Sequence, residues 1–469
     1  MGEDQAKPAS GASPPTETIA AISSPPGRGG IGIVRLSGPL ATSIAAQLVA
    51  LRQPLEHGRA RLADVLDRPA TEDQSATARI DEAVVTFFRA PNSYTADDLV
   101  EIAAHGSPVV LDLLLRRALE LGARLAEPGE FTHRAFLAGR LDLTQAEAVR
   151  DLIDAQTLTQ ARQAASQMGG SLSRRVAPIK QSLVELIALL EAGIDFAEDD
   201  IDVTPRQEIA RHIEELAPPL AKLEASFSLG RIVHDGLTLA IVGRPNAGKS
   251  SLFNRLVERD RAIVTATPGT TRDTVSERIS LDGIPLELVD TAGLRESHEE
   301  AEQMGVVRSR EALADAGLVL VVLDATLPLN EEERNLLAAV RGRPALVAIN
   351  KTDLAAPASS ASELNGLPAV ATSALTGEGI PALRERILAL ASGGASSEPG
   401  MLTSLRHHQA VTTGLRAIND AATANTSNIP HEMILLDLYR ALWALDSLTG
   451  QTTSDDILNL IFSTFCIGK

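Results

Sequence analysis

A phosphate-binding loop is the feature of this 469-residue chain that most constrains its fold. Residues Gly243 to Ser250, with the sequence GRPNAGKS, fit the pattern GxxxxGK[ST]. They follow an apolar run that predicts a strand and open a stretch with helical periodicity. The glycines let backbone N–H groups close around a phosphate at a helix N-terminus, which favours anions. The loop therefore predicts an α/β nucleotide-binding domain, in which Lys249 reaches the β- and γ-phosphates and Ser250 binds Mg²⁺.

Three later segments indicate which base the nucleotide carries. Asp290–Gly293 and Asn350–Asp353 each end a predicted strand, and Ser373–Leu375 follows another. An aspartate at position 353 pairs with the N1–H and 2-amino donors of guanine, whereas adenine has no such donors on that edge. A carboxylate at Asp290 can hold Mg²⁺ through water, and a backbone N–H of the last segment can meet guanine O6. The four motifs in this order predict GTP binding.

The apolar pattern predicts how the chain is divided. From about residue 231 to 392 short apolar runs alternate with helical stretches, which predicts a parallel sheet with helices on both faces. The expected strands of this sheet are Leu237–Val242, Ile284–Val289, Leu318–Leu323, Ala345–Ile349 and Ala369–Thr372. The segments before and after it, 132–230 and 393–469, are predicted to be helical. The α/β domain is therefore expected to be inserted into one helical domain.

The N-terminal part of the chain has a mixed pattern. Residues 17–131 are expected to form an α+β domain, and residues 1–16, rich in Pro, Ser and Ala, a disordered leader. The strands expected there are Glu17–Ile22, Ile31–Leu36, Ile80–Phe88 and Leu99–Ala103, with a helix over Pro108–Leu121. Near the other end, Tyr439 and Trp443 lie four positions apart and are expected to be core residues.

Charge and cysteine content limit the environment and the partners of the chain. It has 43 Lys and Arg against 61 Asp and Glu, a net charge of −18. Binding of nucleic acid phosphates needs clustered basic residues, so a partner would have to supply them. The single cysteine, Cys466, excludes an intramolecular disulfide and fits a reducing cytoplasm. No apolar run is long enough to predict a membrane span.

The motifs do not themselves supply a group that orients the attacking water. Ras-like GTPases have a glutamine directly after the segment that corresponds to Asp290–Gly293, but this chain has Leu294. Leucine cannot orient water, so another side chain must do so. The following loop, residues 295–303, contains four glutamates, and no arginine finger is evident.

Seven segments, spread over most of the chain, indicate its family. They are Pro25–Gly30 with Arg35, Asn92–Thr95, Pro128–Phe131, Arg140–Glu147, Gly243–Ser250, Gly269–Asp273 and Ile461–Lys469. With them the chain closely resembles the bacterial tRNA modification GTPases of the MnmE (TrmE) family from about Thr18 to Lys469. The resemblance implies a folate-binding N-terminal α+β domain, a discontinuous all-α domain and an inserted Ras-like P-loop G domain.

The resemblance also implies an activity and partners. Family members are homodimers through their N-terminal domains and act with the flavoprotein MnmG (GidA), in a heterotetramer or larger complex. Together they place an aminomethyl or carboxymethylaminomethyl group on C5 of the wobble uridine of certain tRNAs. The one-carbon unit comes from a reduced folate, 5,10-methylene- or 5-formyl-tetrahydrofolate, and FAD is bound to the partner.

Nucleotide and metal positions follow from the same resemblance. The family uses K⁺ in place of an arginine finger, and the matching positions are Asn246, Thr265, Thr267 and Thr270. Thr271 matches a second Mg²⁺ ligand beside Ser250, and Glu302 matches the glutamate that orients the catalytic water. The other positions that match nucleotide contacts are Ala247, Gly248, Lys249, Ser251, Ala266, Pro268, Gly269, Asp290, Thr291, Ala292, Gly293, Asn350, Lys351, Asp353, Ser373 and Ala374.

The folate positions implied by the resemblance are Arg35, Glu101, Arg140 and Lys469. Some family members have lysine where this chain has Arg140, which keeps the charge but changes the geometry. Cys466 is either a catalytic thiol near the one-carbon unit or a small packed side chain.

Two other functions are compatible with part of the sequence. A regulatory GTPase of the ribosome-assembly type would share the G domain but would lack Pro25–Gly30 and the Cys-Ile-Gly-Lys ending. A stand-alone folate enzyme would leave the G domain without a role.

Overall fold

The structure is a computed structural model that describes residues 17–67, 79–195, 205–258, 276–290, 316–356, 361–392, 398–451 and 455–468. The chain forms two compact units. The first comprises residues 1–150 and 446–469, and the second comprises residues 151–445. None of the described helices is both long and apolar enough to cross a membrane. The predicted five-segment division stays a prediction, because a grouping into two units does not test it.

The first unit contains a seven-stranded sheet, which is mostly antiparallel. Its order is β3-β4-β5-β6-β2-β1-β7. The strands are β1 (Ile19–Ile22), β2 (Gly29–Ser37), β3 (Val49–Leu51), β4 (Ala60–Leu66), β5 (Arg79–Phe88), β6 (Leu99–Gly106) and β7 (Arg124–Leu125). The helices are α1 (Ala41–Leu48), α2 (Pro108–Glu120), α3 (Glu130–Leu137), α4 (Leu143–Asp154), which continues into the second unit, and α15 (Asp455–Ser463).

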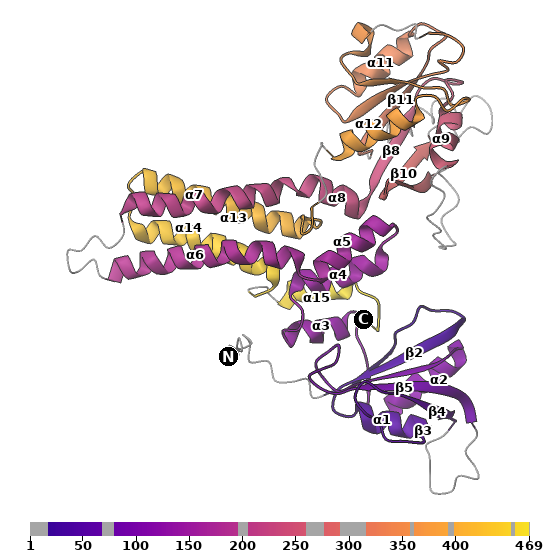
Figure 1. The fold of residues 1–469 in the computed structure, drawn as a ribbon, viewed down its shortest axis with the longest axis vertical. Coiled ribbons are helices and arrows are strands. Elements are labelled where there is room, and N and C mark those ends of the chain that lie inside the picture. Colours follow the sequence, from indigo (N-terminus) through magenta and orange to yellow (C-terminus); the bar gives the residue numbers. More distant parts are fainter. Residues whose placement is uncertain are drawn as a thin grey trace. The chain divides into compact units, whose positions relative to one another are not determined.

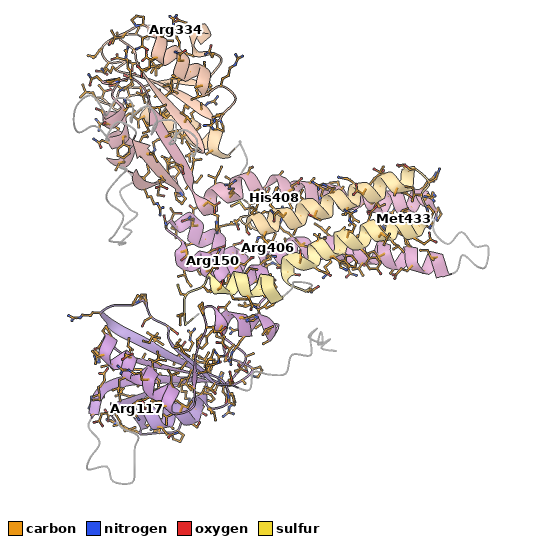
Figure 2. All side chains as sticks on the ribbon, turned by 180° about the vertical axis from the view of Figure 1, so that it is seen from behind. Arg117, Arg150, Arg334, Arg406, His408 and Met433 are labelled. Carbon is orange, nitrogen blue, oxygen red and sulfur yellow. The ribbon has the colours of Figure 1, made fainter. Side chains whose placement is uncertain are left out.

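Helices α1 and α2 bury one face of this sheet. Their apolar positions, such as Ile44 and Leu114, pack with alternate residues of the central strands in one core cluster. A Cβ atom on Gly32 of β2 would lie only 2.4 Å from Leu111, so the glycine lets helix and strand approach closely. Arg117 of α2, labelled in Figure 2, donates to the carbonyl of Gln47 at the end of α1 and thereby ties the two helices together.

The second unit contains a six-stranded sheet in the order β13-β12-β11-β8-β10-β9. Its strands are β8 (Leu237–Val242), β9 (Ser276–Leu281), β10 (Ile284–Asp290), β11 (Leu318–Asp324), β12 (Ala345–Asn350) and β13 (Ala369–Ala371). The helices of this domain are α9 (Lys249–Glu258), α11 (Glu331–Ala339) and α12 (Ile380–Ser392), with a short 3₁₀ turn η3 (Ala361–Leu364). Strands β11 and β12 are buried on both faces, as expected for the centre of a parallel sheet.

Residues from both sides of the α/β domain form the helical part of this unit. The helices are α5 (Leu158–Met168), α6 (Ser171–Asp195), α7 (Arg206–Ala225), α8 (Phe227–Asp235), α13 (Leu405–Thr426) and α14 (His431–Thr449). Figure 1 shows α6, α7, α13 and α14 lying side by side, although the inserted domain separates them in sequence. Phe227 of α8 stacks on His408 of α13 with 4.1 Å between ring centroids. The prediction of a discontinuous helical domain is confirmed.

Two predictions need correction, and strand β4 was missed. The sheet of the inserted domain is not wholly parallel, because β9 pairs antiparallel with β10 at its edge. Strand β4, which the sequence analysis did not predict, pairs with β5 in the first unit. Trp443 is 58% exposed, so it is not a core residue, and Tyr439 beside it is only half-buried with its hydroxyl donating to Glu191.

Candidate functional site

The phosphate-binding loop joins the end of β8 to the start of α9, the arrangement that the motif requires. Gly243 has a φ of +149°, and a Cβ atom there would lie 2.3 Å from the Val322 carbonyl oxygen. Gly248 has a φ of +92°, and its Cβ would lie 2.2 Å from Nδ2 of Asn350. Both positions therefore require glycine. Lys249 is buried, and its ammonium group donates to the carbonyls of Gly243 and Arg244 at 2.8 and 2.9 Å.

Asn350, at the end of β12, connects two motifs that are more than a hundred residues apart. It is 1% exposed. Its Nδ2 donates to the carbonyl of Ala247 in the phosphate-binding loop at 3.0 Å. Its Oδ1 accepts from the backbone N–H of Ala374 in the loop after β13, also at 3.0 Å. The side chain amide thus holds the predicted phosphate and base segments at a fixed separation.

Lys351 is held by an ion pair at the same edge of the sheet. Its backbone has a φ of +67°, and its ammonium group donates to Oδ2 of Asp324 at 2.8 Å. Burial by itself raises the pKa of Asp324, but hydrogen bonds from Lys351 and Thr326 outweigh it and lower the pKa to about 2. The carboxylate is therefore charged at neutral pH, and the stem of Lys351 is fixed beside the phosphate-binding loop.

The structure brings several other predicted residues to the same edge. Asp290 is the last residue of β10 and lies opposite Ile241 of the neighbouring β8. Asp353 and Asn246 are exposed, and Ser250 and Ser251 are exposed in the first turn of α9. Ser373 is buried in the loop after β13. The remaining predicted nucleotide and metal positions, Thr265, Ala266, Thr267, Pro268, Gly269, Thr270, Thr271, Thr291, Ala292, Gly293 and Glu302, lie outside the described residues.

Sequence reasoning also missed the polar contacts that Arg255 makes at this site. Arg255 of α9 donates from Nε to the carbonyl of Ala374 and from Nη2 to the carbonyl of Leu375, at 2.9 and 2.6 Å. No local motif indicates this pairing, because the two partners are more than a hundred positions away in the sequence.

The first unit has a second cluster of predicted site residues. Arg35 of β2 and Glu101 of β6 are register neighbours, and Nε and Nη2 of Arg35 donate to Oε1 of Glu101 at 3.0 and 2.7 Å. The Arg35 guanidinium lies 5.6 Å from the ring centre of Tyr94 and 5.5 Å from that of Phe131. The Arg140 guanidinium is 5.4 Å from the same Tyr94 ring. We call these five residues the arginine–aromatic cluster.

The end of the chain lies against this cluster. The carbonyl oxygen of Gly468 accepts from Nη1 of Arg35 at 3.3 Å and from the hydroxyl of Ser23 at 3.0 Å. Gly468 has a φ of +95°, and a Cβ atom there would lie 2.6 Å from the Ile22 carbonyl oxygen. Ile467 bridges to Pro128, and Cys466 is a free, exposed thiol. Lys469 lies outside the described residues.

The arrangement of the cluster explains what sequence reasoning did and did not find. Arg35, Glu101 and Arg140 were predicted as site residues. The structure places both guanidinium groups near the Tyr94 ring and pairs Glu101 with Arg35. Tyr94, Phe131 and Gly468 were not predicted as site residues. They lie within the segments Asn92–Thr95, Pro128–Phe131 and Ile461–Lys469, so the signal was present as motifs without individual roles.

The fold and the first site together define a class of protein. A phosphate-binding loop lies between β8 and α9, and three further motifs of the GTP-binding set end or follow strands of the same sheet. Parallel strands place such segments at one edge, where open α/β sheets bind their ligands. The inserted domain is that of a P-loop GTP-binding protein.

Comparison with known domain families extends this to the whole chain. Residues 18–140 match the family "GTP-binding protein TrmE N-terminus", and residues 143–466 match the family "MnmE helical domain". The chain belongs to the MnmE family of tRNA modification GTPases.

Individual relatives agree with this assignment. A tRNA modification GTPase MnmE from Koribacter versatilis is 58% identical over 97% of this chain and 99% of its own length. Another from Symbiobacterium thermophilum is 43% identical over the same shares. Among solved structures, the G domain of the FeoB iron transporter of T. maritima is 30% identical, with a TM-score of 0.25, over 33% of this chain and 98% of that one.

Proposed function

We propose that this protein is a K⁺-activated GTPase that acts with the flavoprotein MnmG to modify C5 of the wobble uridine of certain tRNAs. The modification would be an aminomethyl or carboxymethylaminomethyl group, with a reduced folate as the one-carbon donor. The main support for the proposal is that one chain of this family contains two ordered candidate binding sites. One is the glycine-rich phosphate-binding loop fastened by Asn350, and the other is the arginine–aromatic cluster beside the chain end.

In the proposed nucleotide site, each described residue has a role that its geometry supports. The ammonium group of Lys249 donates to carbonyls of the same loop that would surround the β- and γ-phosphates. Ser250 is exposed in the first turn of α9, where its hydroxyl fits a Mg²⁺ ligand. Asp353 is exposed at the edge of the sheet and would accept from N1–H and the 2-amino group of guanine. Mg²⁺ would neutralise phosphate charge.

For hydrolysis, we propose that K⁺ supplies the positive charge that an arginine finger supplies elsewhere. Asn246 has a left-handed backbone with a φ of +62° and an exposed side chain, so its amide oxygen can face a cation at the phosphates. Carbonyls of Thr265 and Thr267, with Thr270, would complete the K⁺ site, and Thr271 would join Ser250 on Mg²⁺. Glu302 would orient the attacking water. These five residues lie outside the described part of the chain.

In the proposed folate site, the cluster residues fit the chemistry of the ligand. Two guanidinium groups near one tyrosine ring suit a flat heteroaromatic ring and carboxylates. Glu101 is only partly buried and is fastened by Arg35 through Oε1, so its second carboxylate oxygen can accept a hydrogen bond. Lys469 would pair with the glutamate tail, and the exposed Cys466 would lie near the one-carbon unit. When bound, the folate supplies the one-carbon group.

A homodimer through the first unit is part of the proposal. Four cross-strand neighbours, Ile33, Ala103, Val84 and Leu62, form a row over β2, β6, β5 and β4. Leu62 and Val84 are 49% and 42% exposed. An apolar row on an accessible sheet face is typical of an interaction surface. Because each chain has a net charge of −18, the dimer would rely on the basic surface of a partner to bind tRNA.

The proposal is tested by nucleoside analysis of tRNA from a strain that lacks this protein. Wild-type chain should restore the modified wobble uridine. Lys249→Ala should fail to restore it and lack GTP hydrolysis, whereas Arg35→Ala should fail to restore it with hydrolysis retained. If Arg35→Ala restores full modification, the cluster is not the folate site. If the wild-type chain leaves the wobble uridine unmodified, the proposed activity is wrong.

A further inference from the structure

The loop that follows β13 is fastened from two opposite sides. On the amide side, the N–H of Ala374 donates to Oδ1 of buried Asn350 at 3.0 Å. On the carbonyl side, the guanidinium of Arg255 donates to the carbonyls of Ala374 and Leu375 at 2.9 and 2.6 Å. Arg255 is half-buried on α9, the helix that starts at the phosphate-binding loop.

Because peptide groups are planar, the contacts of Arg255 with these carbonyls also fix the directions of the N–H groups that follow them. The carbonyl of Ala374 and the N–H of Leu375 belong to one rigid peptide plane, so fixing the carbonyl fixes the direction of the N–H. The second contact fixes the next plane, whose N–H, that of Thr376, already donates to Oγ of Ser373 at 3.1 Å. Among the described residues, the structure gives the Leu375 N–H no hydrogen-bond partner, while the Ser373 N–H donates to the carbonyl of Glu378 at 2.9 Å.

We propose that Arg255 is a positioning residue for guanine recognition. It would not itself touch the nucleotide, but it fixes the peptide plane whose N–H, that of Leu375, would meet guanine O6. The proposal rests on the assignment of the Ser373–Leu375 loop as the reader of O6 in the proposed function. Arginine suits the task because its planar guanidinium can hold two neighbouring carbonyls at once.

The test compares two substrates that differ only at position 6 of the base. GTP carries an oxygen there, and 6-thio-GTP carries sulfur, a weak acceptor, while both keep the N1–H and 2-amino donors that Asp353 would read. Dissociation constants of both are measured on the full chain with Mg²⁺, for the wild type, Arg255→Met and Arg255→Lys. Methionine keeps an unbranched apolar stem and removes the donors. Asn254→Ala, at an exposed neighbouring position of α9, is the matched control.

The wild type should bind GTP more tightly than 6-thio-GTP. In Arg255→Met this preference should fall by roughly threefold to tenfold, as expected for the loss of one modest hydrogen bond, mainly through weaker GTP binding. Arg255→Lys should be intermediate, because one ammonium group can hold one carbonyl, and Asn254→Ala should match the wild type.

Two outcomes overturn the proposal in different ways. If Arg255→Met weakens both nucleotides equally, the arginine only stabilises the domain and does not position the O6 contact. If the wild type itself binds GTP and 6-thio-GTP equally, the Ser373–Leu375 loop does not read O6. That result would remove the premise in the proposed function as well as the inference.

Discussion

Asp353 and Asn350 lie three positions apart, yet their surroundings are opposite. Asn350 is buried, and its amide contacts two backbone groups with one N–H and with its oxygen. Asp353 is exposed, so its carboxylate is accessible to a ligand. We propose that Asn350 holds the two loops together and that Asp353 recognises the base.

For Asp353→Asn we expect GTP affinity to fall by at least about tenfold, because the amide puts a donor against guanine's N1–H or 2-amino group. Affinity for xanthosine triphosphate should rise, since the amide can donate to its 2-oxo group. Competition binding with both nucleotides measures this. Leu354→Ala, at an exposed adjacent position, is the control and should bind as the wild type does. An unchanged GTP affinity in Asp353→Asn would contradict the base assignment.

At equal ionic strength, GTP hydrolysis should be faster in KCl than in NaCl. The reason is that Asn246 and the segment Thr265–Thr271 match a K⁺ site, and no arginine finger is evident in the sequence. Steady-state phosphate release in the two salts measures the difference. Identical rates would remove the monovalent cation from the mechanism.

At the scale of helices and strands, an ion pair joins α4 to α8. Nε2 of His234 lies 3.2 Å from Asp151, and its Nδ1 lies 2.7 Å from Asp235. The hydrogen bond with Asp151 is the main cause that raises the pKa of His234 to about 9, while burial opposes it. Gln160 of α5 also donates to the His234 carbonyl, so three helices meet immediately before β8.

Because the folded pKa is raised above its unfolded value of about 6.5, the pair stabilises fully below that pH. Its contribution, of the order of 1–3 kcal/mol, should be lost as pH rises through about 9. Thermal unfolding should therefore show a larger loss of stability between pH 6.5 and 9 in the wild type than in Asp151→Asn. NMR titration of His234 should show a lower pKa in the variant. Equal pH dependence in both proteins would contradict this role.

Comparison of the helices and strands with the sequence patterns shows which of them could be predicted. Strands β8, β10, β11 and β12 were predicted almost residue for residue. Three of them, β8, β11 and β12, are buried at almost every position, and strands buried on both faces are continuous apolar runs. Strands β4 and β9 were missed because charged residues, such as Asp64 and Arg278, interrupt their patterns at the edge of a core. Trp443 was misplaced because periodicity alone does not tell which side of a helix faces a neighbour.

The candidate sites also contain features that the sequence predicts and features that it does not. The ends of strands marked by motifs were predicted correctly, since each motif is local in sequence. The contacts of Arg255 and of Gly468 were not, because each joins residues that only the folded chain brings together.

At the scale of the whole molecule, each unit combines residues from distant parts of the chain. In the first unit, α15 and residues 466–468 return to the N-terminal sheet, and Phe462 of α15 stacks on His133 of α3 with 4.6 Å between ring centroids. The carbonyl of Gly468 then reaches Arg35. In the second unit, the helical part likewise uses residues from both sides of the inserted domain.

Removal of Cys466–Lys469 should abolish tRNA modification and leave GTP hydrolysis nearly unchanged. The deletion takes away the Gly468 carbonyl from Arg35 and Ser23, whereas the nucleotide site lies entirely in the second unit. Nucleoside analysis and phosphate release measure the two activities on the same preparation. Gly468→Ala should act in the same direction, because its Cβ would collide with the Ile22 carbonyl. Normal modification by the truncated chain would contradict the proposed role of the chain end.

The bridge made by Asn350 has a consequence for how a nucleotide leaves. One amide holds the phosphate-binding loop with its nitrogen and the loop after β13 with its oxygen, so neither loop can relax without disturbing the other. In the proposed site, the guanosine and the triphosphate would therefore be held by two loops that share one side chain. The binding free energies of the guanosine and of the triphosphate should therefore not simply add. Binding of either part would order the Asn350 side chain and so favour binding of the other part. Exchange of GDP for GTP would then proceed as a single opening of both loops.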